Sequence, residues 1–234
     1  MERLGIIAGS AFLDGLPPAG TEERIIPTDR GDVTVHLAEG FVFLRRHGHG
    51  GYYPPHRIPH HAHALALQRL EVRRAVGLAS MGSLRAGLAT GTAVVPDDYL
   101  SAHPPPTFAE DDRLHIVPTL DQGLRQILLD TARATEGPVQ DGGVYAETRG
   151  PRFETRAEIR LLADYAHVIG MTAASEATLL QELDIAYAIL GLVDNMAHGV
   201  GPEQLTIQSY EAQLARNRAR AEAILTELVR RWEP

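Results

Sequence analysis

The chain has 234 residues and a formal net charge of −8, and 44% of its residues are hydrophobic and 22% charged. This composition is typical of a globular protein and excludes an intrinsically disordered or low-complexity chain. The acidic balance argues against general nucleic-acid binding, and because cysteine is absent, the chain has no disulfide, zinc–thiolate site or cysteine nucleophile.

The N-terminus starts with a short apolar run and lacks the long apolar core and cleavage site of a signal peptide. No apolar run reaches the roughly 18 residues that a membrane span requires. We therefore expect a cytoplasmic protein that binds neither membranes nor nucleic acid.

Short apolar runs that end in glycine or polar residues predict buried strands. In chain order these runs are residues 4–8, 42–44, 75–79, 93–95, 168–169 and 185–193. Apolar residues at helical spacing predict helices at residues 61–70, 121–136, 155–165, 175–183 and 207–232. This alternation predicts an α/β fold with a mixed central β-sheet flanked by helices. No linker or repeat interrupts the pattern, so we expect residues 1–234 to form a single domain.

Two segments rich in glycine and proline, residues 48–59 and 101–112, are expected to be loops. They are also the candidate lids of a ligand site.

Polar side chains follow several of the predicted strands, at the edge where open α/β sheets bind ligands. These positions carry Ser10, Arg46, His47, Ser80, Thr172 and Asn195. Hydroxyls, a guanidinium, an imidazole and backbone N–H groups beside glycine suit an oxyanion such as phosphate. Each of these residue types is also common in loops that bind nothing, so only their combination indicates a site.

Residues 150–158, Gly-Pro-Arg-Phe-Glu-Thr-Arg-Ala-Glu, join a turn to the start of a helix. The aromatic face of Phe153 and the carboxylate of Glu154 suit a flat heterocycle that carries N–H donors. The structural alternative makes Phe153 a core residue and Glu158 an acid favoured by the helix dipole.

Residues 170–176, Gly-Met-Thr-Ala-Ala-Ser-Glu, follow another predicted strand. Here too a structural alternative is open. Met171 can fill a gap in the core, and Thr172 or Ser175 can cap the next helix.

Six of the eleven histidines lie between residues 47 and 63, a density that can indicate metal binding. This tract has no His-Glu-x-x-His pattern and no interleaved acidic ligands. From the sequence we therefore expect no metal site.

Taken in order, the motifs make the sequence similar to the trimeric purine nucleoside phosphorylase / methylthioadenosine phosphorylase family. The resemblance extends from Gly5 to the C-terminal helix. Residues 6–10 (IIAGS), 44–49 (LRRHGH), 81–85 (MGSLR), 91–97 (GTAVVPD), 150–158 (GPRFETRAE) and 170–172 (GMT) carry it.

The resemblance implies phosphorolysis, in which a purine nucleoside and inorganic phosphate give free purine and ribose 1-phosphate without a metal or organic cofactor. It implies that phosphate binds to Ser10, Arg46, His47 and Thr172. Ser80 would add backbone contacts beside phosphate and ribose.

The resemblance further implies that Met171 packs against the ribose and that Phe153, Glu154 and Asn195 surround the base. Asn195, Glu154 and His47 are then the candidate catalytic residues.

Two positions decide which purine is expected. Asn195 can donate to purine N7 or O6, and Glu154 can accept from N1–H, which matches a 6-oxopurine. The related methylthioadenosine phosphorylases place Asp and typically Ser at these two positions. Asp194 precedes Asn195, and a shift of one residue would reverse the expectation.

Two alternatives remain for the group that the substrate carries at the ribose 5′ position. Ile207 and Tyr210 would favour an apolar methylthio group, whereas His198 or a loop histidine could serve a 5′-hydroxyl. The resemblance implies a homotrimer in which His115 reaches the site of a neighbouring subunit.

We therefore expect a 6-oxopurine nucleoside phosphorylase that acts on inosine or guanosine. The alternative is a 5′-methylthioadenosine or 5′-methylthioinosine phosphorylase. A weaker alternative is a non-catalytic nucleoside-binding paralogue, because Ala79, His60 and His63 depart from the residues usual in the family.

Overall fold

The computed structural model describes residues 2–12, 17–110, 115–202 and 204–232. Its described strands form an eleven-stranded sheet. The strands are β1 (Leu4–Ala8), β2 (Glu22–Ile26), β3 (Val33–Leu37), β4 (Phe41–Arg45), β5 (Arg74–Ser83), β6 (Ala93–Val95), β7 (Asp98–Ser101), β8 (Val139–Asp141), β9 (Val144–Glu147), β10 (Val168–Gly170) and β11 (Ala186–Met196). The helices are α1 (His60–Arg69), α2 (Gln122–Arg133), α3 (Arg156–Ala163), α4 (Ala173–Glu182) and α5 (Ile207–Trp232), with 3-10 turns η1 (Ser10–Phe12) and η2 (Pro55–Arg57).

The centre of the sheet is parallel, because β1 pairs with β4 and β5, and β5 pairs with β11. These strands contain the apolar runs of the sequence, and β1 is buried along its whole length, as strands covered on both faces are. Antiparallel pairs extend the sheet through β2 and β3 on one edge and through β10 beside β5. The sheet is therefore mixed, which confirms the expected fold class.

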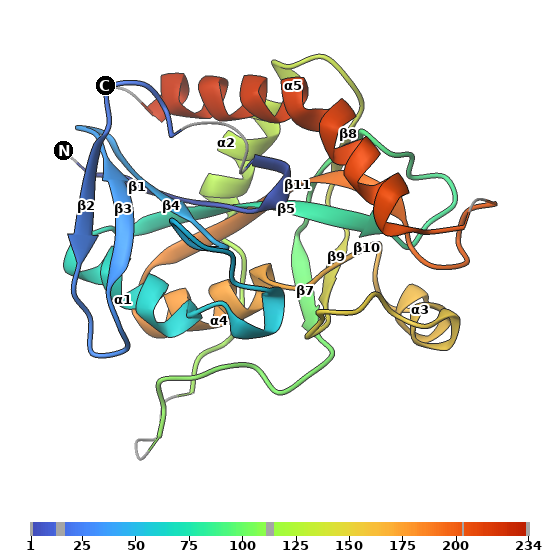
Figure 1. Ribbon diagram of the computed structural model, residues 1–234, viewed down its shortest axis with the longest axis horizontal. Helices are drawn as coiled ribbons and strands as arrows, with labels where there is room; N and C mark the ends of the chain where they lie inside the picture. The colour runs from blue at the N-terminus through green and yellow to red at the C-terminus, as the bar shows by residue number, and fades with distance from the viewer. Residues whose placement is uncertain (1, 13–16, 111–114, 203, 233–234) are drawn as a thin grey trace.

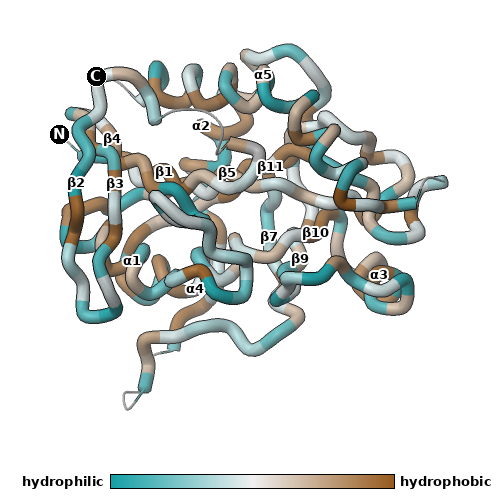
Figure 2. The backbone as a smooth tube through the Cα atoms, in the orientation of Figure 1, coloured by the Kyte–Doolittle hydropathy of each residue, from teal (hydrophilic) through white to brown (hydrophobic). Residues whose placement is uncertain are grey.

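Helices cover both faces of the sheet (Figure 1). On one face, α2 and α5 enclose a core that includes Leu128 and Ile224, and on the other, α1 and α4 enclose a core that includes Leu67 and Leu179. The hydropathy of the backbone follows these layers, with apolar residues along the central strands and inner helix faces (Figure 2). No helix in the described ranges is long and apolar enough to cross a membrane.

The topology brings distant motifs to one place. β1 and β4 end side by side, because Ala8 and Arg45 are partners in the ladder. β10 runs antiparallel to β5, with Ile169 opposite Gly82, so the segment after Gly170 returns toward the middle of β5. In β11 the pairing with β5 is irregular between Val193 and Asn195, which is typical of a β-bulge.

The two expected loops fall between these elements. Residues 48–59 contain η2 and lead into α1. Residues 101–112 follow β7 and include residues 111 and 112, which lie outside the described ranges.

Candidate active site

A cavity of about 340 Å³ is lined by the residues that the sequence nominated, with two exceptions. Its lining includes Ser10, Arg46, His47, Ser80, Phe153, Glu154, Met171, Thr172, Asn195, Ile207 and Tyr210. The exceptions are His198 and the exposed His115, neither of which lines this cavity. Tyr52 and Gly82 also line it, and sequence reasoning did not nominate them.

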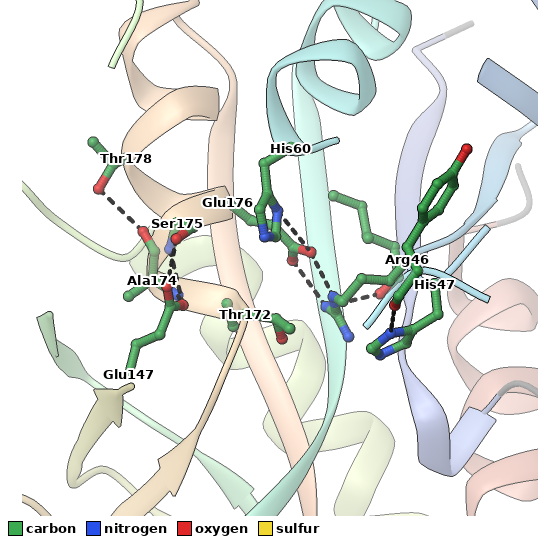
Figure 3. Close-up of polar contacts among 12 residues, drawn as sticks. Arg46, His47, His60, Glu147, Thr172, Ala174, Ser175, Glu176 and Thr178 are labelled. Carbon is green, nitrogen blue, oxygen red and sulfur yellow. Dashed lines mark hydrogen bonds and ion pairs between the residues drawn. The ribbon is translucent and has the colours of Figure 1, made fainter. Parts of the chain in front are cut away.

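Arg46 and Glu176 form a buried ion pair beside the cavity (Figure 3). Nε of Arg46 donates to Oε1 of Glu176 at 2.5 Å, and Nη2 donates to Oε2 at 2.8 Å, which is the bidentate geometry of a strong pair. Burial alone would lower the pKa of Arg46, but the carboxylate of Glu176 outweighs it and the pKa is raised. Arg46 is therefore positively charged, and the carboxylate of Glu176 lies directly against it.

The guanidinium of Arg46 has little capacity left for a ligand. Nη1 also donates to the carbonyl of Leu78 at 2.8 Å, and Nη2 to that of Ile7 at 3.3 Å. Four hydrogen bonds thus use four of the five N–H groups of the guanidinium, and one on Nη1 remains. A Cβ on Gly9 would clash with Nη1, so glycine is required there for the close approach.

His47 is held in one orientation by the segment that follows it. Nδ1 donates to the carbonyl oxygen of Tyr53 at 2.9 Å, and the ring of Tyr52 stacks on the imidazole with centroids 5.1 Å apart. Burial lowers the pKa of His47, which favours the neutral ring. The hydrogen bond assigns the proton to Nδ1, so Nε2 presents a lone pair, 3.4 Å from Oγ of Ser10.

The N-terminus of α4 is already satisfied by protein groups. The N–H groups of Thr172 and Ala173 donate to Oη of Tyr145 at 3.3 Å, and those of Ala174 and Ser175 donate to Oε2 of Glu147 at 2.6 and 3.0 Å. The structural alternative, in which the side chain of Thr172 or Ser175 caps this helix, is therefore not what the structure has. A carboxylate from β9 caps the helix instead (Figure 3).

This arrangement leaves the hydroxyl of Thr172 available. Thr172 is the N-cap residue of α4, yet its side chain makes no capping hydrogen bond. It lines the cavity together with Ser10 and His47. Three side chains that can bond a ligand oxygen therefore share one cavity.

Glu154 and Asn195 bring a carboxylate and an amide to the same cavity. Oε1 of Glu154 accepts from Oγ1 of Thr148 at 2.5 Å, and Nδ2 of Asn195 donates to the carbonyl of Met196 at 3.1 Å. Glu154 is buried and Asn195 is half-buried. Each retains capacity for a ligand, because Oε2 and the second N–H are not used by these bonds.

Asp194 does not line this cavity but a separate groove beside α5. Its Oδ1 accepts from Nδ2 of Asn217 at 2.6 Å. Burial raises the pKa of Asp194 to about 6. Asn195 lines both this groove and the cavity, so of the two neighbouring polar side chains only Asn195 reaches the cavity.

Aromatic and apolar side chains line another part of the cavity. The rings of Phe153 and Tyr210 meet edge to face with centroids 5.8 Å apart, and Oη of Tyr210 lies 3.2 Å from Oγ of Ser80. Ile207 is 53% exposed at the start of α5. His198 instead donates from Nδ1 to the carbonyl of Glu154 at 3.1 Å and does not line the cavity.

Sequence reasoning missed the residues that support this site. Glu176 and Glu147 are buried carboxylates that hold Arg46 and the start of α4. The available signal was Glu176, which lies in a stretch of small and apolar residues, 171–180, because an acid buried in such a stretch needs a partner.

Comparisons with known proteins show which family the chain belongs to. A family model described as "Phosphorylase superfamily" matches residues 3–230. A probable 6-oxopurine nucleoside phosphorylase from Archaeoglobus fulgidus is 36% identical over 98% of this chain and 97% of its own. A probable S-methyl-5′-thioinosine phosphorylase from Methanosarcina acetivorans is 33% identical over 89% of this chain and 83% of its own. A crystal structure of a methylthioadenosine phosphorylase from an antarctic soil metagenomic library covers 97% of this chain and 85% of that one, with 28% identity and a TM-score of 0.84.

Proposed function

The chain belongs to the phosphorylase superfamily as a member of its purine nucleoside phosphorylases, which are pentosyltransferases, and from this premise we propose that it cleaves 6-oxopurine nucleosides with inorganic phosphate. The products are the free base, hypoxanthine or guanine, and ribose 1-phosphate. One observation carries the proposal: Glu154 and Asn195 line the same cavity as Ser10, His47 and Thr172, whereas Asp194 does not.

Four residues form the proposed phosphate subsite, namely Ser10, Arg46, His47 and Thr172. The hydroxyls of Ser10 and Thr172 and the remaining N–H of Arg46 donate to phosphate oxygens. The lone pair on Nε2 of His47 accepts the hydrogen that hydrogen phosphate carries. Two hydroxyls, one N–H of the paired Arg46 and the acceptor nitrogen of His47 therefore bind the anion, and the backbone N–H groups at the start of α4 take no part.

Phosphate attacks C1′ of the ribose while the bond from C1′ to purine N9 breaks, and the bonding electrons leave with the purine. The proton of hydrogen phosphate ends, in net terms, on the purine. Holding both reactants in line can contribute roughly 7–11 kcal/mol toward the barrier. The phosphate dianion also stabilises the ribosyl cation that forms beside it. No nucleophilic side chain is needed.

The proposed base subsite consists of Phe153, Glu154 and Asn195. Asn195 donates to N7 or O6 of the purine, where negative charge grows as the base leaves. Glu154 accepts from N1–H of a 6-oxopurine. Adenine has a lone pair at N1, so an ionised Glu154 would oppose it, and a buried mismatch of this kind costs about 1–3 kcal/mol.

A second candidate substrate, 5′-methylthioinosine, keeps the same base. It is favoured by the apolar lining near the start of α5, where Ile207 lines the cavity and Phe153 packs against Tyr210. A methylthio group would be buried there, whereas a 5′-hydroxyl would need a polar partner.

We also propose a homotrimer in which His115 contributes to the site of a neighbouring subunit. The exposure of His115 and its place outside the cavity of its own chain support this role.

The test is phosphate-dependent release of free base from inosine, guanosine, adenosine, methylthioadenosine and methylthioinosine by the purified chain. The proposal predicts turnover of the 6-oxopurine substrates and a much lower kcat/KM for the two 6-amino substrates. Turnover of methylthioadenosine alone would overturn the assignment of the base subsite. Binding without turnover would indicate the non-catalytic paralogue.

A further inference from the structure

Away from the cavity, three side chains that can ligate a metal ion come together at the edge of the sheet. Glu23 on β2 and His36 on β3 are direct partners across the antiparallel pair. His49 comes from the segment after β4. One ligand atom from each of the three lies within 4.8 Å of the other two, and no other trio of His, Cys, Asp or Glu in the described ranges meets that condition.

Among the described residues, one ring nitrogen of His36, the inner histidine of this cluster, has no hydrogen-bond partner. His36 is 7% exposed, and its Nε2 is buried with no hydrogen-bond partner among the described residues. The rings of His36 and His49 lie 5.6 Å apart, and Nε2 of His49 lies 3.2 Å from Oε2 of Glu23. A buried ring nitrogen without a partner is unfavourable unless it binds something.

We propose that Glu23, His36 and His49 bind a divalent transition-metal ion of the Zn²⁺ class. Two imidazoles and one carboxylate are a known zinc ligand set that leaves a fourth position for water. Metal–ligand bonds of about 2.0–2.2 Å place tetrahedral ligand atoms roughly 3.3 Å apart. The 3.2 Å separation of His49 and Glu23 already fits, and the third ligand atom, which lies within 4.8 Å of both, would approach by up to about 1.5 Å.

The charges around the cluster permit a cation. Oε2 of Glu23 faces Nε2 of His49, and the carboxyl group of Glu23 favours positive charge at His36. Arg45 acts on His36 in the opposite sense, so a bound cation depends on its direct bonds to the three ligands. A bound ion would therefore exchange the His49–Glu23 contact for two stronger bonds and would also give His36 a partner.

The site would connect the sheet edge to the cavity. His49 is two residues from His47, whose carbonyl accepts from the N–H of Tyr53 at 2.7 Å and whose Nδ1 donates to the carbonyl of Tyr53. A metal ion held by His49 would tie the start of this turn, residues 47–53, to β2 and β3. It would thereby restrict the turn that orients His47.

The first test is calorimetric titration of the untagged full-length protein with ZnCl₂ after dialysis against a chelator. We expect one ion per chain. His49→Ala and Glu23→Gln should each weaken binding by at least tenfold, because even outer-shell partners of metal ligands are worth roughly 10–100-fold. The matched control is His56→Ala, which removes another exposed histidine of the same segment and should bind like the unmodified chain.

The second test is hydrogen exchange of peptides that span residues 47–53, with and without Zn²⁺. Protection should increase on Zn²⁺ addition in the unmodified chain and in His56→Ala, but not in His49→Ala. Because His49 and Glu23 are exposed, these variants should fold, and circular dichroism checks that they do. The proposal is overturned if no saturable binding occurs, or if His49→Ala and Glu23→Gln bind Zn²⁺ like the unmodified chain. Neither test depends on the proposed enzymatic activity.

Discussion

The proposed phosphate and base subsites are built in different ways. In the phosphate subsite, Arg46 and His47 are buried and already bonded to the protein, so the geometry is fixed before a ligand arrives. In the base subsite, one side-chain hydrogen bond to another described residue holds each of Glu154 and Asn195, whereas four such bonds hold Arg46. A preformed subsite suits the substrate that every phosphorylase shares. A base subsite in which two side chains select the base suits the substrate that differs between phosphorylases.

The largest effect is expected from Arg46→Ala, which breaks the buried pair with Glu176. Removing one partner of such a pair costs about 3–5 kcal/mol in the free energy of unfolding. The rate of phosphorolysis should also fall sharply in this variant. Arg69→Ala is the control, because the Arg69–Asp29 pair is on the surface, and such pairs contribute about 0–1 kcal/mol. Urea unfolding measures the free energy of unfolding of both variants. Similar losses of stability in Arg46→Ala and Arg69→Ala would contradict the difference expected between a buried and a surface ion pair.

The same pair can be replaced instead of broken. An Arg46→Met/Glu176→Leu/Tyr187→Phe triple variant should recover much of the stability lost in Arg46→Ala, because apolar side chains of similar size often replace a buried pair at little cost, and Tyr187→Phe removes the buried hydroxyl that donates to Glu176. If Arg46 also binds phosphate through its remaining N–H, phosphorolysis stays low in this stable variant. Recovery of full activity would instead assign Arg46 a purely structural role.

Asp194, behind the base subsite, should make stability depend on pH. Its pKa of about 6 in the folded chain exceeds its ordinary value of 3.8. The carboxyl therefore favours folding below pH 3.8, and that contribution is lost as the pH rises from about 4 to 6. The full difference corresponds to about 3 kcal/mol.

Asp194→Asn keeps the acceptor for Asn217 and cannot ionise. The free energy of unfolding of this variant, minus that of the unmodified chain, should increase between pH 4 and pH 6 and then level off. Urea unfolding across this range measures it. A pH-independent difference would show that Asp194 is not the titrating group.

Thr172→Val tests the free hydroxyl of the phosphate subsite. A hydrogen bond to a charged group contributes about 1.5–3 kcal/mol, so the KM for phosphate should rise by about tenfold or more while the KM for nucleoside changes little. Thr178→Val is the matched control, because Thr178 lies on the same helix and its hydroxyl donates to the carbonyl of Ala174. Equal effects of both variants on the phosphate KM would remove Thr172 from the subsite.

The smallest effect is expected from Tyr210→Phe. It removes the contact between Oη and Ser80 but keeps the ring against Phe153. A neutral hydrogen bond contributes about 0.5–1.5 kcal/mol, so the KM for nucleoside should rise by only a fewfold. Tyr165→Phe, on an exposed side chain, should change nothing. A loss of activity as large as that of Arg46→Ala would contradict the passive role of Tyr210.

Much of the fold could be predicted because its central strands are apolar runs. The expected strands at residues 4–8 and 93–95 and the helix at residues 207–232 have the predicted limits. The edge strand β2 was missed because its sequence, EERII, is largely exposed and lacks the alternation of a half-buried strand. β9 was missed because four residues, VYAE, carry too little pattern.

The site could be predicted where its residues are adjacent in sequence, as in Arg46–His47 and Met171–Thr172. Their partners could not. Glu176 lies 130 residues from Arg46, and Glu147 caps α4 from a strand that the sequence did not predict. Pairing of this kind depends on topology. The same is true of Glu23 and His36, which only the register of two edge strands brings to His49.

The central claim is that Glu154 and Asn195 select 6-oxopurines. The most direct measurement is the ratio of kcat/KM for methylthioinosine to that for methylthioadenosine, in the unmodified chain and in a Glu154→Ser/Asn195→Asp double variant. These substrates differ only in the base, so the effect of the shared ribose 5′ group on kcat/KM cancels in the ratio. With about 1–3 kcal/mol at each position, the ratio should fall by at least tenfold in the variant. An unchanged ratio in a folded, active variant would contradict the claim.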